Sequence, residues 1–208
     1  MNPAPLIDGF ILGFSLILAI GAQNSFVIRQ GLARNHVLLS VGFCAVSDML
    51  LIILGIAGMG LFAEKFFNAY YQWIFILAAI WIAFYGVSHL RNVFTSFDQS
   101  TQEYRPEQIG KKQTLVKLFV LTFVNPHVYL DTLVLIGIIS LQYKGADVWG
   151  FGIGASLASL AFFISLGFGA SAMSSLFNNK MAWRILDSII AGIMFFISLK
   201  LIYQSGII

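Results

Sequence analysis

Six apolar segments, each about the length of one membrane crossing, dominate this sequence of 208 residues. They run approximately over residues 6–27, 37–62, 70–90, 115–141, 148–173 and 183–204. A helix needs about 20 residues to cross a hydrocarbon layer of about 30 Å. Charged residues make up only 10% of the chain, against roughly 25% in soluble domains. The sequence therefore predicts an all-α integral membrane protein with six transmembrane helices. A soluble enzyme, a nucleic-acid-binding protein and a disordered chain all fit poorly.

The basic residues predict how the spans are oriented. Those at alternate connections are Arg29, Arg34, Arg91, Arg105, Lys111, Lys112, Lys117, Lys180 and Arg184, and those on the opposite side are Lys65, Lys144 and Lys200. The side richer in Lys and Arg faces the cytoplasm, so both termini are expected outside. No basic residue precedes Arg29, so we expect no cleaved signal peptide.

The longest connection divides the chain into two parts. Residues 93–114 are polar and charged and are expected to form a cytoplasmic linker loop. They separate a first three-helix half, residues 1–92, from a second, residues 115–208. Because three is an odd number of crossings, the two halves would have opposite topology in the membrane.

Two apolar segments are interrupted by polar residues. In the fourth, Asn125 and Pro126 precede His127 and Asp131. Proline breaks or kinks a helix, and Asn followed by Pro is a favoured helix start. We expect a half-helix to begin here at membrane depth, with a positive end that attracts a carboxylate. A simple proline kink is the alternative.

The first segment contains a matching interruption at Gly21, followed by Gln23 and Asn24. Gly21 and Asn125 lie 104 positions apart, which is half of 208. Interruptions at corresponding positions of two halves point to the binding site of a transporter. Alternatively, the two amides simply approach the cytoplasmic interface.

Acidic residues at membrane depth are functional candidates, since burying Asp at the bilayer centre costs about 2.5–3.5 kcal/mol. Asp131 is the strongest, and Asp48 lies near the middle of the second segment. Asp48 could hold a proton or a substrate ammonium, or form a buried hydrogen bond to another helix. Asp187 is expected to form an interfacial ion pair with Arg184, and Lys200 to extend outward.

The remaining features limit the partners. The single Cys44 excludes an intramolecular disulfide and a multi-thiolate centre, so we expect no cofactor and no resident metal. We also expect lipid around the protein and no nucleic acid. Small residues in the fifth segment favour close helix contact, within one chain or in a homodimer; they are Gly150, Gly154, Ser156 and Ser159.

Three stretches resemble one known family. The run from Ser15 to Gly31 is similar to the opening motif of the lysine/arginine exporter (LysE) family, and the stretches from Ala45 to Asp48 and from Asn125 to Asp131 agree with it. The resemblance covers essentially the whole chain. The family's motif positions fall here on Gly21, Gln23, Asn24, Asp48, Asn125, Pro126 and Asp131. One departure is Ala22, where the family usually has proline.

This resemblance implies a non-enzymatic exporter of L-lysine or L-arginine in a bacterial inner membrane. By alternating access, the substrate carboxylate would face the half-helix after Asn125, aided by Gln23 and Asn24. Asp131 or Asp48 would bind a cationic group, and the other would carry a coupling proton. Rival hypotheses are an exporter of threonine or homoserine, an intramembrane aspartyl protease, and an ion channel or metal carrier that uses His127.

Overall fold

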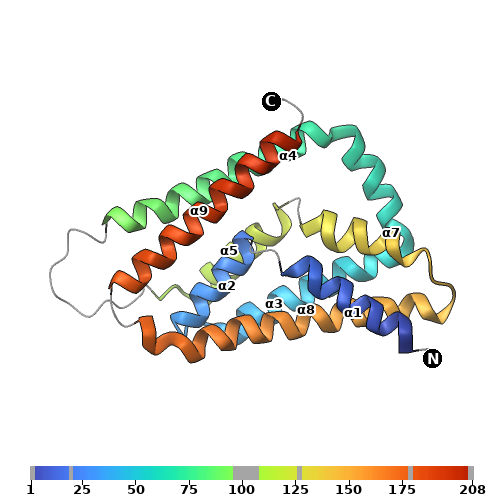
Figure 1. Ribbon diagram of the computed structural model, residues 1–208, viewed down its shortest axis with the longest axis horizontal. Helices are drawn as coiled ribbons and strands as arrows, with labels where there is room; N and C mark the ends of the chain where they lie inside the picture. The colour runs from blue at the N-terminus through green and yellow to red at the C-terminus, as the bar shows by residue number, and fades with distance from the viewer. Residues whose placement is uncertain (1–2, 19–20, 96–107, 126–127, 178–179, 206–208) are drawn as a thin grey trace.

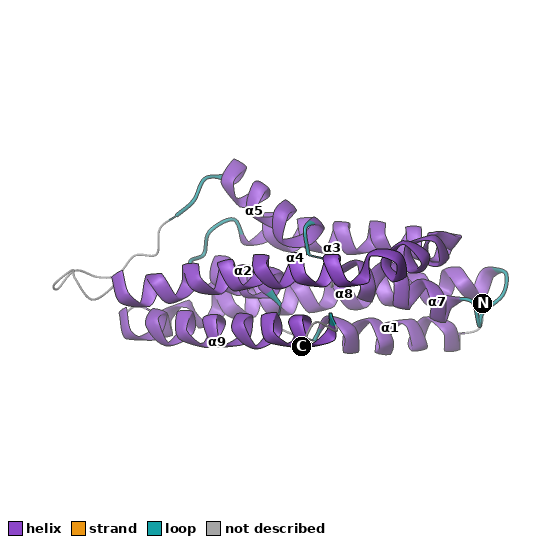
Figure 2. Cartoon of the chain, turned by 90° about the horizontal axis from the view of Figure 1, so that it is seen from above, coloured by secondary structure: helices purple, strands orange, loops and turns teal. Residues whose placement is uncertain are grey.

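The computed structural model describes residues 3–18, 21–95, 108–125, 128–177 and 180–205. These residues are helical almost throughout and include no strand (Figure 2). The elements are α1 (Pro3–Ile17), α2 (Ala22–Leu32), α3 (Val37–Leu54), η1 (Gly55–Met59), α4 (Gly60–Thr95), α5 (Lys111–Phe123), η2 (Tyr129–Leu135), α7 (Ile136–Ser140), α8 (Ala146–Ala172), η3 (Met173–Phe177) and α9 (Lys180–Gln204).

Three described segments are long and apolar enough to cross a membrane: Val37–Gly58, Ala146–Leu176 and Met181–Tyr203. Helices α1 and α2 are long and apolar enough only when taken together, with a bend of 84° between them, as one broken span or as a re-entrant loop. Large apolar side chains also point outward, including Leu38, Phe84 and Phe196, which are 73%, 68% and 70% exposed. Such a surface suits lipid and not water. The chain is therefore an all-helical, multi-pass membrane protein, while the number of six spans stays a prediction.

Helices from distant parts of the sequence pack in pairs (Figure 1). Helix α1 lies along α8, α3 also packs on α8, and α4 lies along α9. The contact between α1 and α8 depends on glycine. A Cβ atom added to Gly9 would lie 2.0 Å from the Phe151 carbonyl oxygen, and one added to Gly154 would lie 2.0 Å from that of Leu6. The small residues of the fifth segment thus allow the backbones to touch, as predicted.

The turn after α3 lies elsewhere than the sequence predicts. We expected the second segment to end at residue 62 and the polar residues Glu64 and Lys65 to separate it from a span at 70–90. The chain instead turns at Gly58, whose φ is +100°, a conformation that favours glycine. Helix α4 then runs from Gly60 to Thr95, and Figure 1 shows that it bends along its length into two arms. Glu and Lys are good helix formers, so their charges do not interrupt α4.

Both expected interruptions are present. Helix α1 ends at Ile17 and α2 begins at Ala22, although the family's proline is absent from position 22. Helix α5 ends at Phe123, and η2 begins at Tyr129. Residues 126 and 127, which include Pro126 and His127, lie outside the described residues.

The same kind of hydrogen bond crosses each interruption. The Asn24 side-chain amide donates to the carbonyl oxygen of Ile17 over 3.2 Å. The Tyr129 hydroxyl donates to the carbonyl oxygen of Phe123 over 2.9 Å. Carbonyl groups at the end of a helix have no partner within it, and hydrocarbon supplies none. A polar side chain from the second half-helix therefore satisfies the last carbonyl of the first.

Candidate functional site

A cavity of about 450 Å³ lies where the two interruptions meet. Its apolar wall includes Ile17, Ile82, Phe163 and Ile193. Its polar and charged residues are Gln23, Asn24, Asp48, Asn125, Asp131 and Lys200. Of the site residues predicted from the sequence, only Pro126 and His127 are missing, because they lie outside the described residues. Residues more than 100 positions apart thus share one cavity.

The start of α2 forms the amide-rich side of the cavity. Gly21 is the N-cap, in an extended conformation, and no side chain caps the helix there. Gln23 and Asn24 in the first turn are 5% and 6% exposed. The side-chain nitrogen of Gln23 is buried without a hydrogen-bond partner. A free amide donor beside the positive end of a helix is suited to an anionic group.

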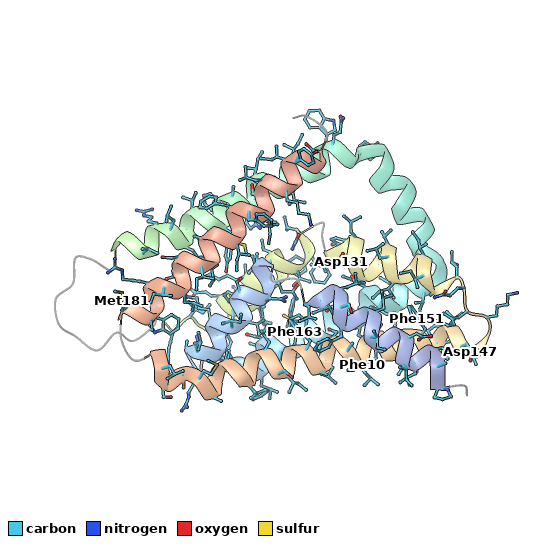
Figure 3. The ribbon with its side chains drawn as sticks, viewed as in Figure 1. Phe10, Asp131, Asp147, Phe151, Phe163 and Met181 are labelled. Atoms are coloured by element: carbon cyan, nitrogen blue, oxygen red, sulfur yellow. The ribbon has the colours of Figure 1, made fainter. Side chains whose placement is uncertain are left out.

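Asp48 and Asp131 form the acidic side. Asp48 is 3% exposed, and its Oδ2 accepts a hydrogen bond of 2.7 Å from the Ser159 hydroxyl on α8. Asp131 is half-buried on η2 and close enough to Asp48 for their charges to interact. Figure 3 shows Asp131 near the centre of the molecule, whereas Asp147 lies at one end of α8. Two neighbouring carboxylates away from bulk water require a cation or a proton.

Lys200 has one feature that the sequence did not predict. We expected its side chain to extend outward from the last span; the residue is exposed, and it also lines the cavity from α9. The charged residues of the described lining are therefore two carboxylates and one ammonium.

A second charged cluster was not predicted as such. Asp187 on α9 is 2% exposed and binds Arg29 of α2 and His89 of α4, with Oδ1 of Asp187 lying 2.7 Å from Nδ1 of His89. Arg29 also lies over the Trp183 ring, at 5.6 Å from its centroid. We expected an interfacial ion pair between Asp187 and Arg184; the carboxylate is instead buried and bound by residues of two other helices. The carboxylate is buried because two other helices supply its partners.

Sequence reasoning missed this cluster for an identifiable reason. Arg29 was counted only as a marker of orientation, and His89 was not considered as a partner of Asp187. The available signal was Asp187 itself, which lies one turn inside an apolar segment. A carboxylate at that depth requires charged or polar partners from other helices, beyond a neighbour on its own helix. Among the described residues, no group of three or more His, Cys, Asp or Glu side chains is arranged to hold a metal ion.

Comparison with known proteins identifies the family of this chain. The chain is 36% identical over 200 residues to the candidate amino-acid transporter YggA of Aeromonas salmonicida, covering 95% of each chain. It is 33% identical over 203 residues to the arginine exporter protein ArgO of Yersinia enterocolitica, covering 97% of each. No solved structure matches the chain. The family model described as "LysE type translocator" matches residues 14–205, and the chain therefore belongs to the family of LysE type translocators.

Proposed function

We propose that this protein exports a basic L-amino acid, arginine or lysine, across the bacterial inner membrane by alternating access around the cavity. One observation carries the proposal: the lining combines two carboxylates, one ammonium and an unpaired amide donor. The similarity to a protein named as an arginine exporter supports it.

The charges of the cavity are the complement of those of a basic amino acid. Arginine and lysine each carry one carboxylate and two cationic groups, whereas the described lining has two carboxylates and one cation. Bound together they form three oppositely charged pairs with no net charge. A neutral amino acid would leave one carboxylate without a counter-charge, and that carboxylate would then need a proton. The lining therefore favours a dibasic substrate.

Each group of the substrate has a partner on a different element. Its carboxylate binds Lys200 and the Gln23 amide at the start of α2. Its α-ammonium and its side-chain cation bind Asp48 and Asp131. The substrate thus connects α2, α3, η2 and α9. Between substrates, a proton on one of the two carboxylates relieves their mutual repulsion.

Export of a cation needs an energy source. The membrane potential opposes outward movement of a positive charge by about 2.3 kcal/mol per 100 mV. A proton that enters on one of the two carboxylates as the substrate leaves cancels that cost. Asp48 suits this role because it is only 3% exposed, and a carboxylate away from water is readily neutralised by a proton.

We further propose that residues 1–92 and 115–208 are halves of opposite topology joined by the cytoplasmic segment 93–114, with both termini outside. The matching side-chain hydrogen bonds across the two interruptions support this arrangement. The pairing of α3 with α8 and of α4 with α9 also supports it, because these helices occupy corresponding positions in the two halves.

The test is counterflow of labelled amino acids into proteoliposomes that contain the purified protein. Arginine and lysine should exchange, threonine should not, and both Asp48→Asn and Asp131→Asn should abolish exchange. Asp147→Asn is the matched control, since Asp147 opens α8 away from the cavity. Exchange of threonine with equal efficiency would establish the neutral-amino-acid alternative. Unchanged arginine exchange in both cavity variants would refute the proposed roles.

A further inference from the structure

A second cavity, of about 510 Å³, lies between α2, α4 and α5. It is separate from the first, because the two share no lining residue. Its basic residues are Arg29, His89 and Lys117, and its described lining includes no acidic residue. Arg29 and His89 bind Asp187, so Lys117 supplies the positive charge available to a ligand. The proposed transport mechanism does not use this cavity.

Two buried polar atoms in this cavity lack hydrogen-bond partners. Gln30 is 5% exposed, and its side-chain oxygen has no donor. The indole N–H of Trp81 is buried and has no acceptor. Buried polar groups are nearly always paired, and an unpaired one costs about 1–3 kcal/mol. A polar ligand with an acceptor for Trp81 and a donor for Gln30 would satisfy both atoms.

The rest of the cavity is apolar and extends to the outer surface. Phe26 and Leu121 form its buried part. Phe84 and Val116 also line it and are 68% and 55% exposed. In a membrane-spanning bundle, side chains this exposed on an apolar surface contact lipid chains. The cavity is therefore basic and polar at one end and continuous with the lipid-facing surface at the other.

We propose that this cavity binds the headgroup of an anionic phospholipid, with its acyl chains lying along Phe84 and Val116. The phosphate accepts hydrogen bonds from Trp81 and Lys117, and a headgroup hydroxyl donates to Gln30. Basic pockets between transmembrane helices bind anionic headgroups, and Trp suits a boundary between polar and apolar surroundings. A basic amino acid is disfavoured, because Lys117 repels its cationic groups and the described lining offers them no carboxylate.

The proposal is tested by thermal unfolding of the purified full chain in a neutral detergent. Phosphatidylglycerol should raise the Tm saturably, whereas phosphatidylcholine and inorganic phosphate should not. Lys117→Gln removes one charge-assisted hydrogen bond and should raise the half-saturating lipid concentration about tenfold. Trp81→Phe, which removes only the indole N–H and part of the ring, should also raise it. Lys112→Gln is the control, because Lys112 lies on the same helix but does not line the cavity.

Three results would overturn the proposal. Phosphatidylcholine could stabilise the protein as well as phosphatidylglycerol does, which would show that the charge of the headgroup is not recognised. Inorganic phosphate alone could give the full shift, which would identify a site for soluble anions. Lys117→Gln and Trp81→Phe could both respond like Lys112→Gln, which would place lipid binding elsewhere. Because none of these measurements involves transport, they are independent of the proposed substrate.

Discussion

Replacing either partner of the buried pair between Arg29 and Asp187 should destabilise the protein more than replacing both. The pair joins α2 to α9, across 158 positions of sequence. Asp187→Asn keeps the shape of the side chain but leaves the Arg29 guanidinium without a counter-charge. Arg29→Leu leaves the Asp187 carboxylate with His89 as its remaining partner in the cluster.

The size of the effect follows from the burial of each partner. Removal of one member of a buried pair costs about 3–5 kcal/mol. The Asp187 side chain is 3% exposed, but that of Arg29 is 21% exposed and retains some hydration. Asp187→Asn should therefore cost about 3 kcal/mol, at the lower end of that range. For a chain of this length, such a loss lowers the Tm by roughly 6–12 °C.

The double variant separates a charge effect from simple loss of contact. Arg29→Leu with Asp187→Leu leaves no buried charge, and apolar replacements for buried ion pairs are often neutral or stabilising. His89 then loses one hydrogen bond, worth about 1 kcal/mol. We expect the double variant to unfold closer to the wild type than either single variant does.

The assay is thermal unfolding of the wild type, Arg29→Leu, Asp187→Leu and the double variant in one detergent without added lipid, analysed as a double-mutant cycle. Asp187→Asn is measured beside them as the variant that keeps the shape of the side chain. The reasoning is refuted if the double variant loses as much stability as the two single variants combined. Additive losses would mean that Arg29 and Asp187 contribute independently, through packing and not through their charges.

Three further predictions concern the helix contacts. Gly154→Ala should destabilise the protein by about 1–3 kcal/mol through overpacking. Gly169→Ala is the control, because the new methyl group would lie in open space. Equal thermal stability of the two variants would contradict the close contact at Gly154. Ser159→Ala removes the donor to Asp48 and should slow arginine counterflow about tenfold, an effect absent if Asp48 takes no part. Tyr129→Phe removes the donor that crosses the second interruption and should cost about 1–3 kcal/mol in thermal unfolding; an unchanged Tm would show that another group satisfies the carbonyl.

The interruptions and the cavity residues were predictable because such residues are rare in apolar segments. Asn125 and Asp131 stand out from a run of Leu, Val and Phe. Because polar and charged side chains are costly to bury in a membrane, these residues are functional candidates even without a structure. The expected break near Gly21 was found although the family's proline is absent. These features depend on local sequence and on the membrane alone.

The remaining features depend on tertiary contacts that no local pattern encodes. Arg29 and Lys200 each lie near the end of a span, where a long side chain can point toward the membrane surface or into the bundle. Only the packing of the helices determines that Arg29 reaches Asp187 and that Lys200 lines the cavity. The turn at Gly58 was missed because glycine is frequent in membrane helices, whereas the charges of Glu64 and Lys65 were a more obvious signal.

The glycine contact between α1 and α8 limits which parts of the protein can move separately. At Gly9 and Gly154 each helix packs directly against a carbonyl oxygen of the other, so neither can slide along its neighbour without collision. Helices α1 and α8 therefore travel as one rigid body, although the 128 residues from 18 to 145 separate the end of α1 at Ile17 from the start of α8 at Ala146. The mechanical units of the transport cycle are then groups of helices drawn from both sequence halves, and a hinge at either interruption would move one such group against the other.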